Sequence, residues 1–153
     1  MKYLIVIILL LPISCTVPCN STIWKHVYEK DRLEIIKKCY TVVGTVVDIS
    51  PVNGDMDSSF SIQVESPDSI NNMLKRYPNN NGLLHIEIVC ACNATSADPS
   101  SIAACKGYKN RIIMPLVGKK IKVTGSLVVD SPNEPNGHNI LEIHPVSHIT
   151  RLN

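Results

Sequence analysis

The sequence predicts an all-β domain of five strands, and three features support this prediction. Apolar residues make up 44% of the chain but aromatic residues only 5%, so Val, Ile and Leu have to supply most of the core. Residues branched at Cβ favour strands. Several segments alternate apolar and polar side chains with the strand period of two, and stretches rich in Pro, Asn and Gly separate them. The 153 residues have room for one such domain.

A secretory leader precedes the predicted domain. Lys2 gives the start a positive charge, residues 4–11 are an unbroken apolar run, and Pro12 ends that run. This order predicts a signal peptide over residues 1–19, with cleavage at one of the bonds between residues 14 and 21. The run is shorter than the about 20 residues that span a bilayer, so we expect no transmembrane anchor and a secreted, extracellular protein.

Three positions are candidates for covalent modification. Lipidation of Cys15 would anchor the protein to a membrane, although Pro12 stands where such a site prefers a larger aliphatic residue. Asn20 and Asn93 each begin an Asn-X-Ser/Thr sequence and are candidate glycosylation sites. Free secretion remains the main expectation, with lipid anchoring as its alternative.

The chain contains six cysteines, which is many for its length, and exported proteins keep disulfides. Cleavage after Cys19 would leave four cysteines, Cys39, Cys90, Cys92 and Cys105. We expect Cys90 or Cys92 to pair with Cys105, and Cys39 to pair with the remaining one. Structural zinc on the last three cysteines is the alternative, but a Cys-X-Cys pair lacks the usual spacer of two to four residues.

Pattern divides the mature chain into an arm and a barrel. We expect residues 20–38 to form an N-terminal arm with a helical turn and residues 39–153 to form the domain. Five segments of the domain have strand patterns: residues 39–50, 60–66, 83–90, 118–130 and 139–149.

Two connections of the domain have helical signals. Asp98 followed by Pro99 predicts a short helix over residues 98–105, between the third and fourth strands, with Asp98 as the N-cap. Residues 68–82 predict a helical turn that ends in an Asn/Gly loop, and we expect this segment to lie on the surface.

This order of elements predicts an OB-like fold, in which a strongly coiled five-stranded sheet closes into a small barrel. Gly44 and Gly125 lie in mid-strand, where such strands have to bend. Pro145 marks the fifth strand as an edge strand or as the place of a bulge. A β-sandwich is the alternative, but it would need about seven strands.

The segments GTV, GD, EIVC, CKGY, IIMPLVGKKIKVTG and EIHPV, in this order, resemble small exported archaeal and bacterial proteins of OB-like architecture. The similarity runs over residues 24–149. The resemblance implies no reaction. It implies that certain residues hold family positions: Cys39, Cys90, Cys105, Glu87, Glu142, Ile143, His144 and Pro145. The family pattern has a His shortly after Gly-Asp, and this chain has Ser61 there, which argues against a site that needs that His.

Strand parity predicts that four candidate metal ligands converge. His85 and Glu87 share the outward face of the third strand, Glu142 and His144 share a face of the fifth, and these strands are neighbours in an OB-like barrel. Imidazole and carboxylate groups suit Zn²⁺ or another divalent metal, and an open coordination position would permit hydrolysis. The alternative is that alternation simply turns polar side chains to solvent, where charged cross-strand pairs are routine.

Other catalytic sites have less support. His138 and His148 are further histidines near the fifth strand, and each is expected to be solvated. No Ser lies in a Gly-X-Ser-X-Gly sequence, the cysteines are expected in disulfides, and Gly118 lacks the preceding glycine of a phosphate-binding loop. We therefore expect no enzymatic activity and no cofactor, with a zinc-type metal site or hydrolase as the alternative.

Six cations form a basic cluster around Tyr108: Lys106, Lys109, Arg111, Lys119, Lys120 and Lys122. OB-like barrels often bind single-stranded nucleic acids or oligosaccharides. The formal net charge is only +2 and aromatic residues are few, so nucleic acid is not the expected partner. The sequence favours a secreted or cell-envelope binding or accessory module, whose partner is an extracellular ligand or a cell-envelope component.

Overall fold

A computed structural model describes residues 19–50, 56–92, 98–132 and 138–153. Residues 1–18, which include Cys15 and most of the predicted signal peptide, and the candidate glycosylation site at Asn93 lie outside the described residues. The strands are β1 Leu33–Ile49, β2 Ser58–Ser66, β3 Leu84–Ile88, β4 Lys120–Asp130 and β5 Ile140–Arg151. The helices are α1 Asp68–Leu74, α2 Pro99–Ala104 and the 3₁₀ helices η1 Ser21–His26, η2 Lys30–Arg32 and η3 Pro78–Asn80.

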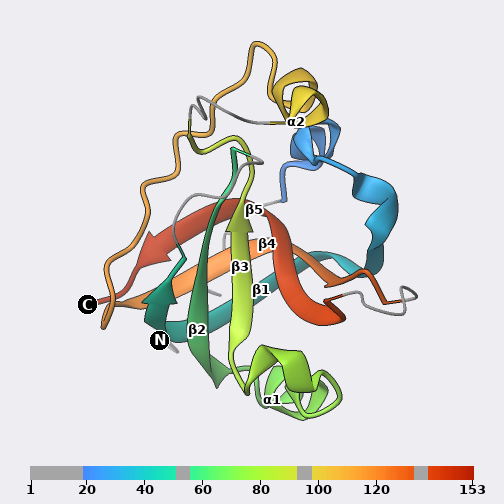
Figure 1. Ribbon diagram of the computed structural model, residues 1–153. Coiled ribbons are helices and arrows are strands. Elements are labelled where there is room, and N and C mark those ends of the chain that lie inside the picture. The colour runs from blue at the N-terminus through green and yellow to red at the C-terminus, as the bar shows by residue number, and fades with distance from the viewer. Residues whose placement is uncertain (1–18, 51–55, 93–97, 133–137) are drawn as a thin grey trace, which may run out of the picture.

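The five strands form a closed barrel in the order β1-β2-β3-β5-β4, and β4 pairs with β1 to complete the ring (Figure 1). The pairing of β3 with β5 is parallel, and the other pairings are antiparallel. The all-β prediction is therefore confirmed. A single closed ring of strands excludes the two separate sheets of a sandwich.

Strand parity places the hydrophobic core inside the barrel. Leu84, Ile86 and Ile88 of β3 are fully buried in the main core cluster. In β4, alternate residues belong to the same cluster: Ile121, Val123, Leu127 and Val129. The residues between these positions face the outer side of the barrel, and this alternation decides where the polar site described below lies.

The barrel bends where strands approach each other closely. At Gly125, a Cβ would lie 2.5 Å from Cγ2 of Ile143 and 2.5 Å from the carbonyl oxygen of Pro145, so only glycine fits. The pairing of β4 with β5 shifts register on both sides of Gly125. Pro145 lies inside β5 at this irregularity, which confirms the predicted bulge, while the alternative of an edge strand is wrong because β5 pairs on both sides.

The first strand begins earlier than predicted. β1 starts at Leu33 and includes residues that we assigned to the arm, because its first half pairs with the end of β4. The remaining arm packs on the outer side of the barrel. It contributes to a second hydrophobic cluster made of Ile23, Val27, Leu33, Val89, Cys90, Cys105 and Val128.

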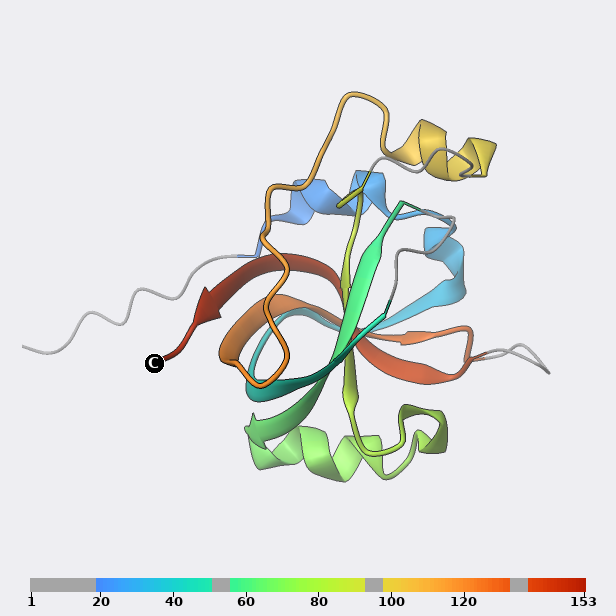
Figure 2. The same cartoon turned by 60° about the vertical axis from the view of Figure 1, so that its left-hand side comes forward.

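The segment after β2 is not a surface excursion, which corrects the prediction for residues 68–82. Ile70 and Leu74 of α1 are buried in the main core cluster, at 0% and 4% exposure. α1 lies at one end of the barrel, opposite the end that carries η1 and α2 (Figure 2). The helix that contacts the barrel interior is thus α1, between β2 and β3.

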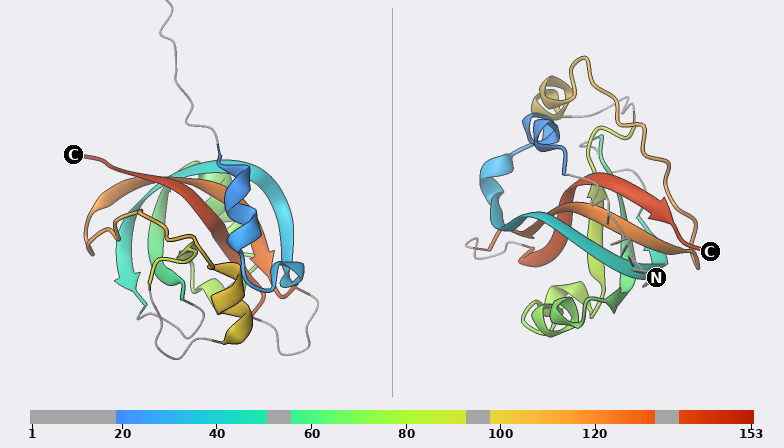
Figure 3. Two further views of the ribbon diagram at one scale, coloured as in Figure 1. Left: turned by 90° about the horizontal axis from the view of Figure 1, so that it is seen from above. Right: turned by 180° about the vertical axis from the view of Figure 1, so that it is seen from behind.

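The predicted helix between β3 and β4 is present as α2. Asp98 is its N-cap and accepts a hydrogen bond from the backbone N–H of Ser100 at 2.8 Å, and Pro99 follows at the first helical position. α2 lies beside η1 over one end of the barrel (Figure 3). His26 links the two, because its Nδ1 lies 2.8 Å from the carbonyl oxygen of Ala104 and its ring stacks on Tyr108.

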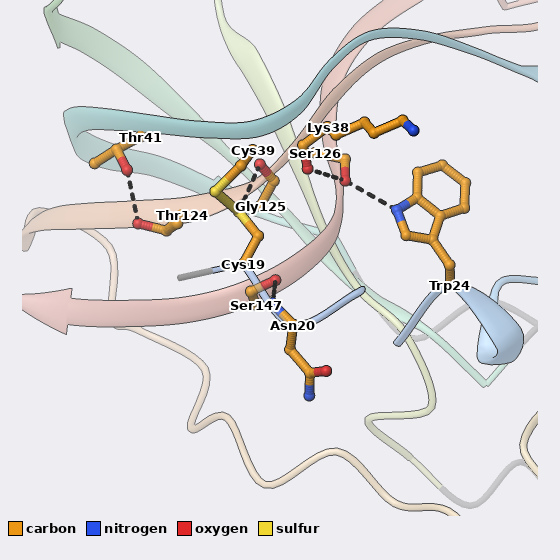
Figure 4. The surroundings of a disulfide bond; sticks show 10 residues. All are labelled: Cys19, Asn20, Trp24, Lys38, Cys39, Thr41, Thr124, Gly125, Ser126 and Ser147. Atoms are coloured by element: carbon orange, nitrogen blue, oxygen red, sulfur yellow. Dashed lines mark hydrogen bonds between the residues drawn. A yellow bond between two sulfur atoms is a disulfide. The ribbon is translucent and has the colours of Figure 1, made fainter. Parts of the chain in front are cut away.

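Two disulfides attach these peripheral segments, and the predicted pairing is only half right. Cys90 pairs with Cys105, which is one of the two pairings predicted for Cys105. Cys39, however, pairs with Cys19 (Figure 4). Cys92 carries a free thiol and lies 2.9 Å from the hydroxyl of Ser58. The prediction was wrong because it placed Cys19 in the leader, which left Cys39 without its nearest partner.

Among the described residues, no helix has the length and the apolar character that a membrane crossing requires.

Candidate functional site

The four predicted metal-site residues converge on the outer side of β3 and β5. The parallel register places His85 opposite Glu142, and Ile86 opposite Ile143. Because the two isoleucines belong to the main core, the polar residues on either side of them face away from it. Glu87 and His144 continue this polar face one step along each strand.

This face is not solvated, so the simple interpretation of surface-exposed polar residues is wrong. Glu87, Glu142 and His144 are only 8%, 2% and 0% exposed, and His85 is half-buried. The N-terminal arm packs on this outer side of the barrel: it buries neighbouring residues such as Val89 in a second hydrophobic cluster, and its Arg32 lies near Glu87 and Glu142. Polar residues buried in this way need partners within the protein.

His144 supplies a partner to both carboxylates. Its Nδ1 lies 2.9 Å from Oε1 of Glu142 and 3.2 Å from Oε2 of Glu87. Burial alone would lower the pKa of His144, but the two carboxylates raise it well above its ordinary value. Burial alone would raise the pKa of Glu87, but the charge of His144 lowers it to about 2. The three side chains therefore form a charged network, with an imidazolium ion between two carboxylates.

The second nitrogen of His144 has no such partner. Nε2 is buried and makes no hydrogen bond within the described part of the chain. A buried polar atom without a partner costs about 1–3 kcal/mol. The polar contacts that hold the ring at this position are therefore those of Nδ1 with Glu87 and Glu142.

A cavity of about 440 Å³ opens over this network. Three of the four predicted residues line it, while His144 lies behind Glu87 and Glu142. The complete lining consists of Tyr28, Glu29, Arg32, His85, Glu87, Asp130, Ser131, His138, Ile140 and Glu142.

The charge of this cavity favours a cation. Four acidic residues and one arginine line it, which gives a formal charge of −4 + 1 = −3 when the histidines are neutral. Arg32 forms an ion pair with Asp130, so its charge is already engaged. A proton on His144 behind the lining would reduce the total to −2, which is still complementary to a divalent cation.

His85, Glu87 and Glu142 have the geometry of a metal site. One ligand atom from each lies within 4.8 Å of the others, and all three residues line the cavity. Asp57, Glu87 and His144 form a second such group, but only Glu87 of these lines the cavity. Asp57 also accepts a hydrogen bond from the backbone N–H of Cys90 at 2.7 Å, so its carboxylate already has a structural task.

A third group of potential ligands is excluded by its chemistry. Asp57, Cys90 and Cys105 lie close together, but both sulfur atoms are in a disulfide. A cysteine binds zinc only as a thiolate, and a disulfide supplies no thiolate. The cysteine zinc site weighed from the sequence is therefore not formed in this structure.

The sequence patterns did not predict several residues of the cavity. Arg32 and Tyr28 come from the arm, which has no strand pattern, and Asp130 was assigned only as the end of a strand. Arg32 is placed in the cavity by its ion pair with Asp130, and no periodic pattern in the sequence predicts that pair. His138 does line the cavity at its exposed rim, whereas His148 lines a different hollow.

The other predicted positions lie away from the cavity. Asn20 is exposed, and its side-chain oxygen caps η1 by accepting a hydrogen bond from the N–H of Thr22 at 3.1 Å. Four cations of the basic cluster lie between the end of α2 and the start of β4, Lys120 and Lys122 lie at the start of β4 itself, and none of the six lines the cavity.

A comparison of the chain with protein-family models, with curated proteins and with solved structures finds no match.

Proposed function

We propose that this chain is an exported, OB-type barrel that binds a divalent metal ion through His85, Glu87 and Glu142. The observation that carries the proposal is the convergence of one imidazole and two carboxylates from adjacent strands on one negatively charged cavity. The protein then acts as a binding module of the cell exterior or cell envelope, with the metal as its ligand.

The OB-type assignment is supported by the strand order and by α2. The ring order β1-β2-β3-β5-β4, a helix between β3 and β4, and glycines at the bends together match this architecture. Export is supported by the leader sequence and by two disulfides, which persist in oxidising compartments. If the disulfide of Cys19 belongs to the mature protein, signal cleavage precedes Cys19.

The donor atoms favour a borderline transition metal such as Zn²⁺. Imidazole nitrogen together with carboxylate oxygen suits zinc, whereas Ca²⁺ takes six to eight oxygen ligands. Three protein ligands would leave further coordination positions directed at the cavity. His144 would hold the two carboxylates from behind, which is how outer residues orient metal ligands.

Calorimetric titration with Zn²⁺ and with Ca²⁺ tests the proposal on protein that has been stripped with a chelator. We expect one Zn²⁺ per chain and no comparable Ca²⁺ binding. His85→Ala should weaken Zn²⁺ binding by about 10- to 100-fold or more, since it removes one of three ligands. His85 is the best first variant because it is only half-buried and lies outside the contacts of His144.

Matched variants control this experiment. His148→Ala removes an exposed histidine of the same strand as Glu142, and Glu34→Gln removes an exposed carboxylate of β1. Both should bind Zn²⁺ like the unaltered protein. The proposal would be overturned if Zn²⁺ did not bind, or if His85→Ala, Glu87→Gln and Glu142→Gln bound it unchanged while circular dichroism showed them folded.

A further inference from the structure

The basic cluster belongs to a segment of unusual charge. No Asp or Glu occurs from Pro99 to Val129, and this stretch carries the six cations of the cluster. Its formal charge is +6, while the whole chain has +2, so the rest of the chain carries +2 − 6 = −4. Cations are thus concentrated on one segment, and the acidic cavity lies elsewhere.

Large apolar side chains of the same segment face solvent. Ile113, Leu116 and Val117 are 76%, 62% and 56% exposed. Between them, Met114 packs against the main core and Pro115 is buried. The segment is therefore anchored to the barrel by its inward residues, and its outward residues are aliphatic.

The tip of this segment is a defined turn. The N–H of Lys119 donates to the carbonyl oxygen of Leu116 at 3.2 Å, and Gly118 has the positive φ of 79° that such a turn requires. The N–H of Gly118 donates to the carbonyl oxygen of Val46 at 2.8 Å. The N–H of Val46 in turn donates to the carbonyl oxygen of Lys119 at 3.0 Å. Val47, the next residue of β1, is 44% exposed. These contacts hold the turn against β1.

Cationic side chains lie beside the exposed isoleucine. Arg111 and Arg151 line a hollow of about 500 Å³ together with Ile113 and His148. In Figure 1, the segment between α2 and β4 runs along the outside of the barrel towards the C-terminus. We call Lys109, Arg111, Ile113, Leu116, Val117 and Lys119 the docking surface; both lysines and Arg111 are exposed.

We propose that the docking surface binds an anionic phospholipid bilayer, with the aliphatic side chains inserted between headgroups and the cations over the phosphates. Basic residues near a membrane are attracted to anionic lipids, and exposed aliphatic residues add burial in the interface. This proposal shares no residue with the metal site and is independent of it.

The composition favours lipid over nucleic acid. Single-stranded nucleic acids bind where aromatic side chains stack on bases along a basic groove. The aromatic residue of the segment is Tyr108, and its ring stacks on His26 with centroids 3.9 Å apart. The uncharged exposed side chains of the docking surface, Ile113, Leu116 and Val117, are aliphatic, which suits acyl chains rather than bases.

Vesicle co-sedimentation tests the proposal. The protein is purified after export from one host, so that all variants share one N-terminus, and is mixed with vesicles of phosphatidylcholine alone or with added phosphatidylglycerol. We expect binding to the anionic vesicles, with little binding to the neutral ones and a decrease at high salt. The triple variants Ile113→Ser/Leu116→Ser/Val117→Ser and Lys109→Gln/Arg111→Gln/Lys119→Gln should each weaken binding by about tenfold or more.

Matched triple and double variants serve as controls. Ile35→Ser/Ile36→Ser removes aliphatic residues that are 43% and 41% exposed on β1. Lys25→Gln/Lys30→Gln/Arg76→Gln removes three cations outside the docking surface. Both should bind anionic vesicles like the unaltered protein.

Three results would overturn the proposal. The first is no sedimentation with anionic vesicles, and the second is equal binding by the docking-surface variants and the control variants. The third is binding to a single-stranded oligonucleotide that the three glutamine substitutions abolish and the three serine substitutions leave intact, without vesicle binding. That third result would assign the cations to nucleic acid.

Discussion

His85 of β3 lies directly opposite Glu142 of β5 in the parallel pairing of these two strands. This register puts the imidazole and both carboxylates on one side of the sheet, and Ile86 and Ile143 on the other. A slip by one residue would turn every side chain of a strand to the opposite face. The hydrophobic core therefore fixes the register, and the register assembles the site.

The network of Glu87, His144 and Glu142 predicts how stability depends on pH in metal-free protein. The pKa of His144 is raised, so its contribution is complete below its ordinary value of 6.5 and is lost as the pH rises towards the folded value. The pKa of Glu87 is lowered from 4.5 to about 2, so its contribution is present above 4.5 and is lost as the pH falls towards 2. The network stabilises most between these limits.

Urea unfolding with a chelator present should thus give a larger free energy of unfolding near pH 5.5 than near pH 8.5. His144→Gln leaves two facing carboxylates in the interior and should cost about 3–5 kcal/mol near pH 5.5. The cost should be smaller near pH 8.5. His148→Gln, an exposed histidine, provides the control. An identical pH dependence in unaltered protein and His144→Gln would contradict this account of the network.

Gly125→Ala should destabilise the barrel because the added Cβ meets Ile143 and the backbone of Pro145 at 2.5 Å. We expect a loss of about 1–3 kcal/mol or more in chemical unfolding. Gly118→Ala is the comparison, because its Cβ meets open space and only its φ of 79° is unfavourable, which costs about 1 kcal/mol. A smaller effect at Gly125 than at Gly118 would mean that β4 and β5 separate readily.

The disulfide pattern predicts the result of peptide mapping. Alkylation without reduction should label Cys92, and digestion should yield linked peptides for Cys19 with Cys39 and for Cys90 with Cys105. The disulfide between Cys90 and Cys105 joins residues that are 15 apart in the sequence, and it restricts the unfolded chain. Without it the unfolded chain is freer, so its removal should lower the free energy of unfolding by about 3 kcal/mol. Recovery of Cys92 in a disulfide, or of an N-terminus beyond Cys19, would show a different pairing.

Trp24 predicts a fluorescence signal for docking of the arm. It is the one tryptophan of the chain, and its indole N–H donates to the hydroxyl of Ser126 at 3.0 Å (Figure 4). Ser126→Ala removes this acceptor, so we expect a shifted emission maximum and a loss of about 1 kcal/mol. Ser69→Ala removes an exposed hydroxyl that contacts Tyr40 and should leave the emission unchanged. Unaltered emission of Ser126→Ala would argue that the arm does not rest on β4.

Local pattern was sufficient to predict the strands and much of the site. The period of two in β3 assigned Leu84 and Ile86 to the core and His85 to the other face, and this holds because a strand alternates by geometry alone. The N-cap of α2 at Asp98 was equally local. Prediction was less accurate where distant segments meet, as at the start of β1, which pairs with the end of β4.

Burial of the site was beyond the reach of local pattern. Glu87, Glu142 and His144 have the sequence spacing of solvated strand residues, and the arm that helps to cover their side of the barrel has no period that reveals where it packs. The pairing of Cys19 with Cys39 was missed for the same reason, because a pairing depends on which ends meet in space.

The sequence by itself determined the five strands, the faces of those strands and the residue types available for chemistry, because these follow from side-chain alternation, turn residues and composition. Only the tertiary structure decided that an imidazole and two carboxylates face one acidic cavity, with a second imidazole behind them. The physical reason is that barrel closure brings β3 beside β5, while the arm packs on the same side of the barrel as their polar face, and neither effect is encoded within a single segment.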